Sequence, residues 1–118
     1  MTKQASSCRR ATLDPAGPAR SIDEIIRLVA REQHVPKALI KHRSRCRAGV
    51  ARARQISMYL CHVIRQHSLA DIGRIFDRDR TTVSYACAVI EDLRDDPRID
   101  AEISRLEAML EVSDAARV

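Results

Sequence analysis

The segment between residues 68 and 93 constrains the fold most, because two apolar patterns of helical spacing flank a break made only of charged residues. The break is Asp77-Arg78-Asp79-Arg80. Ser68, with Asp71 three residues later, has capping-box spacing, and Thr81 or Thr82 can cap the second helix. The predicted inward faces are Leu69, Ile72, Ile75 and Phe76 in the first helix, and Val83, Ala86, Cys87, Val89, Ile90 and Leu93 in the second.

A helix, a tight turn and a second helix that begins with polar side chains is the plan of the helix-turn-helix motif. The second helix of that motif enters the DNA major groove. Helical hairpins of this size also serve purely as packing units, so the pattern alone leaves both interpretations open. Gly73 lacks a side chain, and we expect another helix to approach the backbone there.

Composition predicts that this pair belongs to one compact all-α domain of about five to six helices. The chain has 118 residues and only three glycines, and no segment alternates with period two. We expect a flexible arm over residues 1–20, the helical domain over 21–112 and a disordered tail over 113–118. Within the domain, Ser21 and Glu24 have capping-box spacing, and Pro36 suits the first turn of a short helix.

The longest helix is expected from about Val50 to His67, and its predicted inner stripe is Ile56, Tyr59, Leu60, Val63 and Ile64. Asp100 is expected to cap a last helix with Ile103, Leu106 and Met109 or Leu110 inward. The outer face of that helix is acidic and gives a possible contact for a protein partner.

Charge is distributed unevenly along the chain, which has a net charge of +5. Eight Lys or Arg residues and no carboxylate lie between Gln33 and Ala70, whereas nine acidic residues and four arginines lie from Glu91 onward. Such a cationic segment predicts a polyanionic partner, and the acidic end predicts a face turned to solvent or protein. Phosphate contacts are expected from Lys41, Arg43, Arg47, Arg52 and Arg54. Arg43, Arg45 and Arg47, on a loop, can also reach a minor groove.

Other classes of function have less support. No run is apolar enough for a membrane span or a secretory signal, so a cytoplasmic location is expected. The four cysteines have no CxxC spacing, so no metal or other cofactor is expected; Cys46, between two arginines, is a candidate redox handle. No nucleophile, base and oxyanion donor come together, which argues against an enzyme. Three aromatic residues are too few for a base-stacking surface, which argues against RNA.

Three segments resemble the C-terminal DNA-binding domain of the bacterial replication initiator DnaA. Asp79-Arg80-Thr81-Thr82-Val83 followed by Ala86-Cys87 is similar to the family's R-D-H-T-T-V and H-A-C. The strings Ala51-Arg52-Ala53-Arg54-Gln55-Ile56 and Ser68-Leu69 with Ile72-Gly73 resemble its A-R-x-R-Q and S-L-x-x-I-G. The resemblance covers residues 22–110. It implies a helical domain that binds double-stranded DNA at initiator boxes.

The resemblance also implies roles for individual residues. Arg54 and Gln55 contact DNA at a helix start, and a loop arginine enters the minor groove. We add Ser68 to the phosphate-contacting set. The residues expected to face the major groove are Arg78, Asp79, Arg80, Thr81, Thr82 and Tyr85.

Four departures from the family pattern alter these expectations. The sequence contains no GxxxxGK[ST], so no nucleotide partner and no ATP-driven assembly are expected. Arg80 replaces the usual His, which changes the preferred base. Asp77 stands where two glycines are common, in a turn one residue shorter. The basic loop is about two residues longer and Ala53 replaces Pro, so the minor-groove arginine is ambiguous, with Arg45 favoured.

The leading hypothesis is a stand-alone, initiator-like DNA-binding protein that acts in replication control. A transcription regulator that uses the same module is the alternative within DNA binding. A helical protein-interaction module, working through the acidic last helix or the apolar surface around Leu106, is the alternative from another class.

Overall fold

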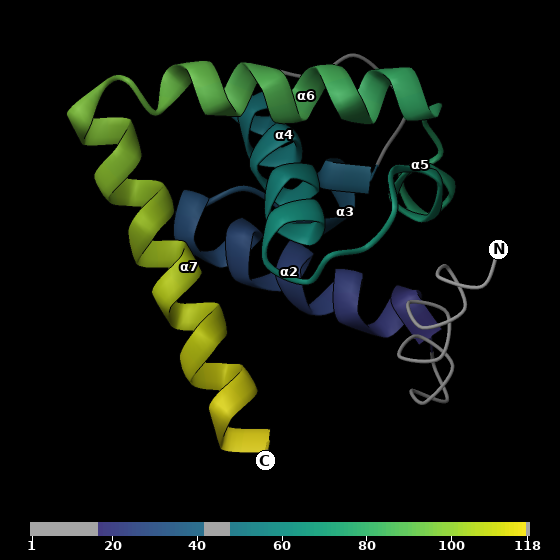
Figure 1. Cartoon of the computed structure of the whole chain (residues 1–118), viewed down its shortest axis with the longest axis horizontal. Coiled ribbons are helices and arrows are strands. Elements are labelled where there is room, and N and C mark those ends of the chain that lie inside the picture. The colour runs from purple at the N-terminus through teal and green to yellow at the C-terminus, as the bar shows by residue number, and fades with distance from the viewer. Residues whose placement is uncertain (1–16, 42–47, 118) are drawn as a thin grey trace, which may run out of the picture.

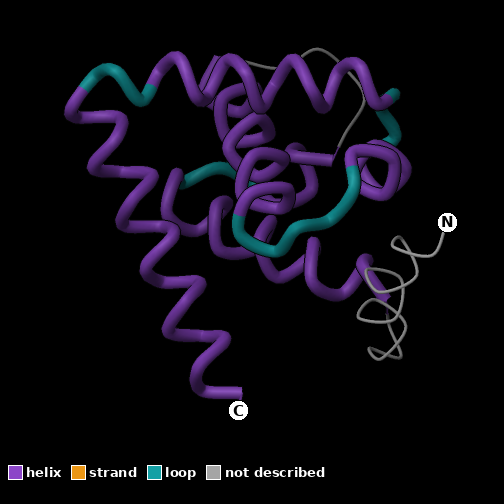
Figure 2. Tube along the Cα trace, viewed as in Figure 1, coloured by secondary structure: helices purple, strands orange, loops and turns teal. Residues whose placement is uncertain are grey.

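The structure is a computed structural model that describes residues 17–41 and 48–117 of the chain. Within these ranges it contains helices and no strand, as predicted. Figure 1 shows the arrangement, and Figure 2 shows how short the described connections are. The helices are α2 (Gly17–Gln33), α3 (Lys37–Lys41), α4 (Ala48–Val63), α5 (Leu69–Phe76), α6 (Arg80–Leu93) and α7 (Pro97–Arg117).

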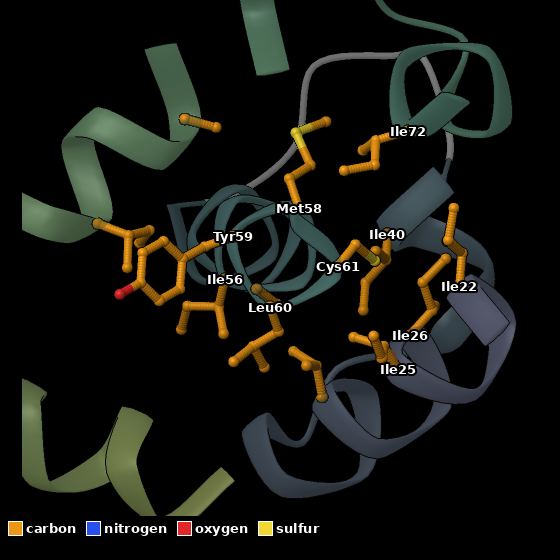
Figure 3. Close-up of a cluster of buried hydrophobic side chains, with 14 of the residues drawn as sticks. Ile22, Ile25, Ile26, Ile40, Ile56, Met58, Tyr59, Leu60, Cys61 and Ile72 are labelled. Carbon is orange, nitrogen blue, oxygen red and sulfur yellow. The ribbon is translucent and has the colours of Figure 1, made fainter. Parts of the chain in front are cut away.

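Helix α4 lies at the centre, in contact with α2, α3, α5 and α6. Its six residues from Ile56 to Cys61 are all buried. Figure 3 shows Met58, Tyr59, Leu60 and Cys61 pointing outward from α4 in different directions, toward different neighbours. Ile56, Tyr59 and Leu60 are buried, as predicted, but Ser57, Met58 and Cys61 outside the predicted stripe are buried too, because neighbouring helices cover this half of α4 on every side. Full burial of a side chain such as Leu60 contributes about 1.5–3 kcal/mol.

The ends of three elements differ from the prediction. Helix α4 ends at Val63, whose side chain is 40% exposed instead of buried. Helix α2 begins at Gly17, four residues before Ser21, and α7 continues to Arg117. Leu106 is fully buried, so it offers no apolar surface to a partner.

Ser21 and Glu24 do not cap a helix, because both lie inside α2. Instead they hold the connection between α4 and α5. Arg65 donates from Nη1 to Ser21 Oγ at 2.8 Å and to Glu24 Oε1 at 3.1 Å, and His67 Nε2 lies 2.9 Å from Ser21 Oγ. His67 is half-buried, and this burial lowers the pKa of its imidazole.

Three non-glycine residues in the described chain adopt left-handed backbone conformations at or just after helix ends: His34 (φ 57°), Gln66 (φ 59°) and Asp77 (φ 59°). After α2, the Val35 N–H donates to the carbonyl of Ala30 at 3.0 Å, which closes the end of the helix. A left-handed conformation costs roughly 1 kcal/mol or more for a residue with a Cβ. The sharp reversals after α2 and α5 are therefore made without glycine, at an energetic cost.

Replacement of Asp77 by Gly should stabilise the protein by about 0.5–1 kcal/mol, because Gly adopts positive φ without a steric penalty and only part of that gain is lost to unfolded-chain entropy. Urea unfolding measures the change. Asp77→Ala is the control and should be destabilising. Equal midpoints for the two variants would show that the turn carries no such strain.

The connection between α6 and α7 is fixed by one arginine. Arg94 donates to Asp100 Oδ1 at 2.6 Å and to Glu107 Oε2 at 2.8 Å, both on α7. It also donates to Tyr59 Oη at 3.2 Å, and its guanidinium lies 5.9 Å from the centre of the Tyr59 ring. Asp100 therefore pairs with Arg94, whereas Asp96 accepts from the backbone N–H of Arg98 at the start of α7.

Candidate nucleic-acid interface

Helices α5 and α6 form a helix-turn-helix, and the turn is closed by the backbone. Asp77 is in the left-handed region, the Arg78 N–H donates to the Gly73 carbonyl at 2.8 Å, and the Asp77 N–H donates to the Arg74 carbonyl at 3.4 Å. This bond pattern is the Schellman motif. The chain therefore reverses within residues 77–79 and starts α6 at once.

Gly73 permits this close turn. A Cβ at position 73 would lie 2.5 Å from the Arg78 carbonyl oxygen, which belongs to the backbone and cannot rotate away. The expected close approach at Gly73 exists, but the neighbour is the turn itself instead of another helix. The glycine thus fixes where α6 begins.

Asp79 caps α6, in place of the predicted Thr81 or Thr82. Its Oδ1 accepts from the backbone N–H of Thr82 at 3.0 Å and from the Thr82 hydroxyl at 2.9 Å. The pKa of the Asp79 carboxyl is lowered, first by the backbone bond from Thr82 and then by the hydroxyl bond. Asp79 and the Thr82 hydroxyl, both predicted to face the groove, therefore bond to each other here.

The outward face of α6 begins with exposed polar side chains. Val83, Ala86, Cys87 and Ile90 are buried, as predicted, and Val89 and Leu93 are partly buried. Tyr85 is 66% exposed, although it is a large aromatic residue. Ser84 also lies on this face, and sequence reasoning missed it. The exposed residues in the first two turns are Arg80, Thr81, Thr82, Ser84 and Tyr85.

Helix α5 carries polar side chains at its start and, near its end, beside the turn. Ser68 Oγ accepts from the Asp71 N–H at 3.0 Å, so Ser68 is the N-cap, as predicted. The Asp71 carboxylate accepts from Arg74 Nη2 at 2.8 Å. Arg74, which sequence reasoning missed, is exposed and lines an open hollow of about 550 Å³ with Gly73, Asp77, Arg78, Asp79 and Thr82. The sequence feature that could have identified Arg74 is a cationic residue on the outer face of α5, one helical turn before the charged segment at residues 77–80.

Two arginines that were predicted to contact DNA also bond to backbone carbonyls. Arg78 Nη1 donates to the Phe76 carbonyl at 3.0 Å, within the turn. Arg54 donates from Nε to the Ile40 carbonyl at 2.7 Å and from Nη2 to the Leu39 carbonyl at 2.9 Å. Arg54 thereby joins the end of α3 to α4. Both residues have positioning roles that the sequence pattern did not predict.

The other predicted phosphate contacts are placed separately. Lys41 is exposed at the end of α3 and Gln55 is partly buried on α4. Arg52 lines a smaller recess of about 210 Å³ with Gln33 of α2 and with Asp96 and Arg98 near the start of α7, away from the hollow at the turn. The predictions for Arg43, Arg45, Cys46 and Arg47 concern residues outside the part of the chain that the structure describes.

No cluster of three potential metal-binding side chains occurs in residues 17–41 and 48–117. The two cysteines within these ranges, Cys61 and Cys87, are unpaired by disulfides and buried. Burial raises the pKa of the Cys61 thiol, and it raises that of Cys87 to about 11. Both thiols act here as small apolar groups. None of the helices within these ranges is long and apolar enough to span a bilayer.

The fold and the turn define the class of protein as a small all-α helix-turn-helix domain. Comparison with known proteins narrows the class, because residues 22–90 match the family described as the bacterial dnaA protein helix-turn-helix. The chain belongs to this family.

Similar proteins include the chromosomal replication initiator protein DnaA of Sphingopyxis alaskensis, 39% identical over 97 residues, which is 80% of this chain and 21% of the relative. DnaA of Rhodopseudomonas palustris strain TIE-1 is 38% identical over 105 residues, or 86% and 22% of the two chains. DnaA of Psychromonas ingrahamii is 41% identical over 75 residues, or 63% and 16%. The chain thus spans about a fifth of the length of these relatives.

Proposed function

We propose that this chain binds double-stranded DNA sequence-specifically, at initiator-box-like sites, in the control of replication initiation. One observation carries the proposal: the first two turns of α6 expose a row of groups able to bond base edges, on a turn whose backbone is fixed. Arg80 pairs with guanine O6 and N7, and the Thr81 methyl fits a thymine methyl. The similarity to proteins named chromosomal replication initiator protein supports a role in this process.

The hydrogen bonds in the turn support different roles for neighbouring residues. Asp79 and Thr82 stabilise the first turn of α6 by bonding to each other. Arg80 and Thr81 then remain available to contact the bases. Ser84 and Tyr85, one turn further along α6, extend the same face. Arg74, which lines the hollow at the turn, and Ser68, at the start of α5, then supply contacts to the flanking phosphates.

The proposal is tested with duplexes selected from a random library, followed by anisotropy titrations of the consensus and of a scrambled duplex. If Arg74 and cations from the segment between Gln33 and Ala70 together neutralise roughly five phosphates, the affinity should fall with salt at a log–log slope of about −4.5. A slope near zero, or no enriched sequence, would contradict duplex binding. A genome-wide binding profile then separates origin sites from promoters, and promoter enrichment alone would favour transcription regulation.

Variants separate base contacts from phosphate contacts. Thr81→Ala should weaken consensus binding by about 1–3 kcal/mol and leave scrambled DNA almost unchanged. Arg74→Ala should weaken both duplexes alike. Thr82→Ala removes a bond to Asp79 as well as any DNA contact, so Thr81→Ala is the cleaner probe. Equal losses on both duplexes for Thr81→Ala would refute its proposed base contact.

A further inference from the structure

Helices α2 and α7 cross near one end of α2 and then diverge (Figure 1). At the crossing, Gln33 Nε2 donates to Glu102 at 2.7 Å, and Arg105 pairs with Glu32 at 2.7 Å. Beyond these contacts an open groove of about 470 Å³ lies between the two helices. Its walls are made by Glu24, Arg27, Leu28, Arg31, Met109 and Leu110.

The floor of the groove is apolar. Leu110 is buried, and Leu28 and Met109 are partly buried against the core. Val112 lies three residues after Met109, on the same face of α7, and is 69% exposed. An apolar strip thus continues from the groove onto the surface. Methionine suits such a surface, because its flexible side chain adapts to different partners.

The rim of the groove is cationic. Arg27 and Arg31 are one helical turn apart, and their side chains are 62% and 68% exposed. Each arginine forms an ion pair through Nε. Arg27 Nε lies 3.7 Å from the Asp23 carboxylate, and Arg31 Nε lies 3.0 Å from the Glu32 carboxylate. Asp23 and Glu32 also form ion pairs with other cations.

Asp23 pairs with Lys37 at 2.8 Å, and Glu32 pairs with Arg105 at 2.7 Å. Glu24, the carboxylate in the groove wall, pairs with Arg65 at 3.1 Å. These three carboxylates are therefore shared with or neutralised by other residues. A partner that supplied new carboxylates to Arg27 and Arg31 would complement this rim.

We propose that the groove between α2 and α7 binds an amphipathic helix of a protein partner. The apolar row of that helix packs on Leu28, Met109 and Val112, and carboxylates beside the row pair with Arg27 and Arg31. In Figure 1, α6 begins at the upper right, whereas the part of α7 that lines the groove lies in the lower half of the view. The partner is therefore held while α6 stays accessible, and the inference does not depend on DNA binding.

The test uses a designed 18-residue helical peptide with a leucine row, flanking glutamates and one tryptophan in the row. Because the chain contains no tryptophan, a saturable blue shift of the peptide fluorescence reports burial in the groove. The double substitution Arg27→Glu and Arg31→Glu should weaken binding about tenfold or more, since each pair becomes repulsive. The milder pair Arg27→Gln and Arg31→Gln should weaken it less, and circular dichroism verifies that each variant is folded.

The matched control is Arg74→Glu with Arg98→Glu, which makes the same charge change at exposed arginines outside the groove. This control should bind the peptide within about twofold of the original chain if contact is local. Equal weakening in both double variants, an unchanged affinity in the Arg27 and Arg31 variant, or no saturable blue shift would overturn the proposal. So would displacement of the peptide by a short duplex DNA, because the peptide would then occupy the DNA-binding face.

Discussion

Replacement of Gly73 by Ala lowers the free energy of unfolding by about 2–3 kcal/mol, because the added Cβ would lie 2.5 Å from a backbone oxygen. The turn from Asp77 to Asp79 must shift to relieve this contact. For a chain of this size the melting temperature should fall by about 10 °C. Differential scanning calorimetry measures both quantities.

Gly49→Ala is the matched control, because nothing lies within 4 Å of a Cβ at that position in the first turn of α4. This substitution should be neutral or stabilising by a few tenths of a kcal/mol. Similar melting temperatures for the two alanine variants would mean that the turn is looser than the structure indicates. DNA titrations below the melting range then test whether the displaced turn also misplaces Arg80.

Replacement of Arg94 by Ala should destabilise the protein by about 2–3 kcal/mol. The side chain is only 20% exposed, and its loss leaves the carboxylates of Asp100 and Glu107 without their counter-ion. The same bonds raise the pKa of the Arg94 guanidinium, the one to Glu107 most. Lys at this position should recover only part of the stability, since one ammonium group cannot replace the forked guanidinium. Urea unfolding measures each variant.

Two further variants separate the ion pairs of Arg94 from a general loss of packing. Arg98 has a side chain that is 91% exposed and a single carboxylate contact at 3.7 Å, so Arg98→Ala should change stability by less than about 0.5 kcal/mol. Glu107→Gln, added to Arg94→Ala, should restore part of the loss because it removes a stranded charge. A loss for Arg98→Ala as large as that for Arg94→Ala would refute the specific role of Arg94.

Periodicity predicted the helical pair from residue 68 to 93 well, because packing there follows local apolar spacing. For α4 it predicted only part of the buried surface, since a helical segment covered on every side also buries residues outside one stripe. Helix ends were also misplaced: Ser21 satisfies a capping pattern but bonds to Arg65 and His67, which lie more than forty residues away. Partners so distant in the sequence cannot be recognised from the local pattern around Ser21.

The sequence predicted which residues lie at the candidate interface better than it predicted the contacts that each one makes. The family motif and the polar helix start directed attention to Arg80 and Thr81, which are exposed. Charge alone could not separate cations that stay at the surface from those that bond to carbonyls, as Arg54 and Arg78 do. That choice depends on which helix end lies beside each guanidinium, which only the tertiary structure defines.

The enclosed position of α4 has a consequence for recognition. A helix that touches four neighbours cannot turn or slide without disturbing all of them, so the face assembled around it is ready before any ligand arrives. If α6 binds DNA as proposed, the entropic cost of forming the complex falls on long surface side chains such as Arg80 and Tyr85, and little of it on the main chain. A preformed surface of this kind would let the protein bind and release many DNA sites rapidly, because its backbone need not rearrange at each one.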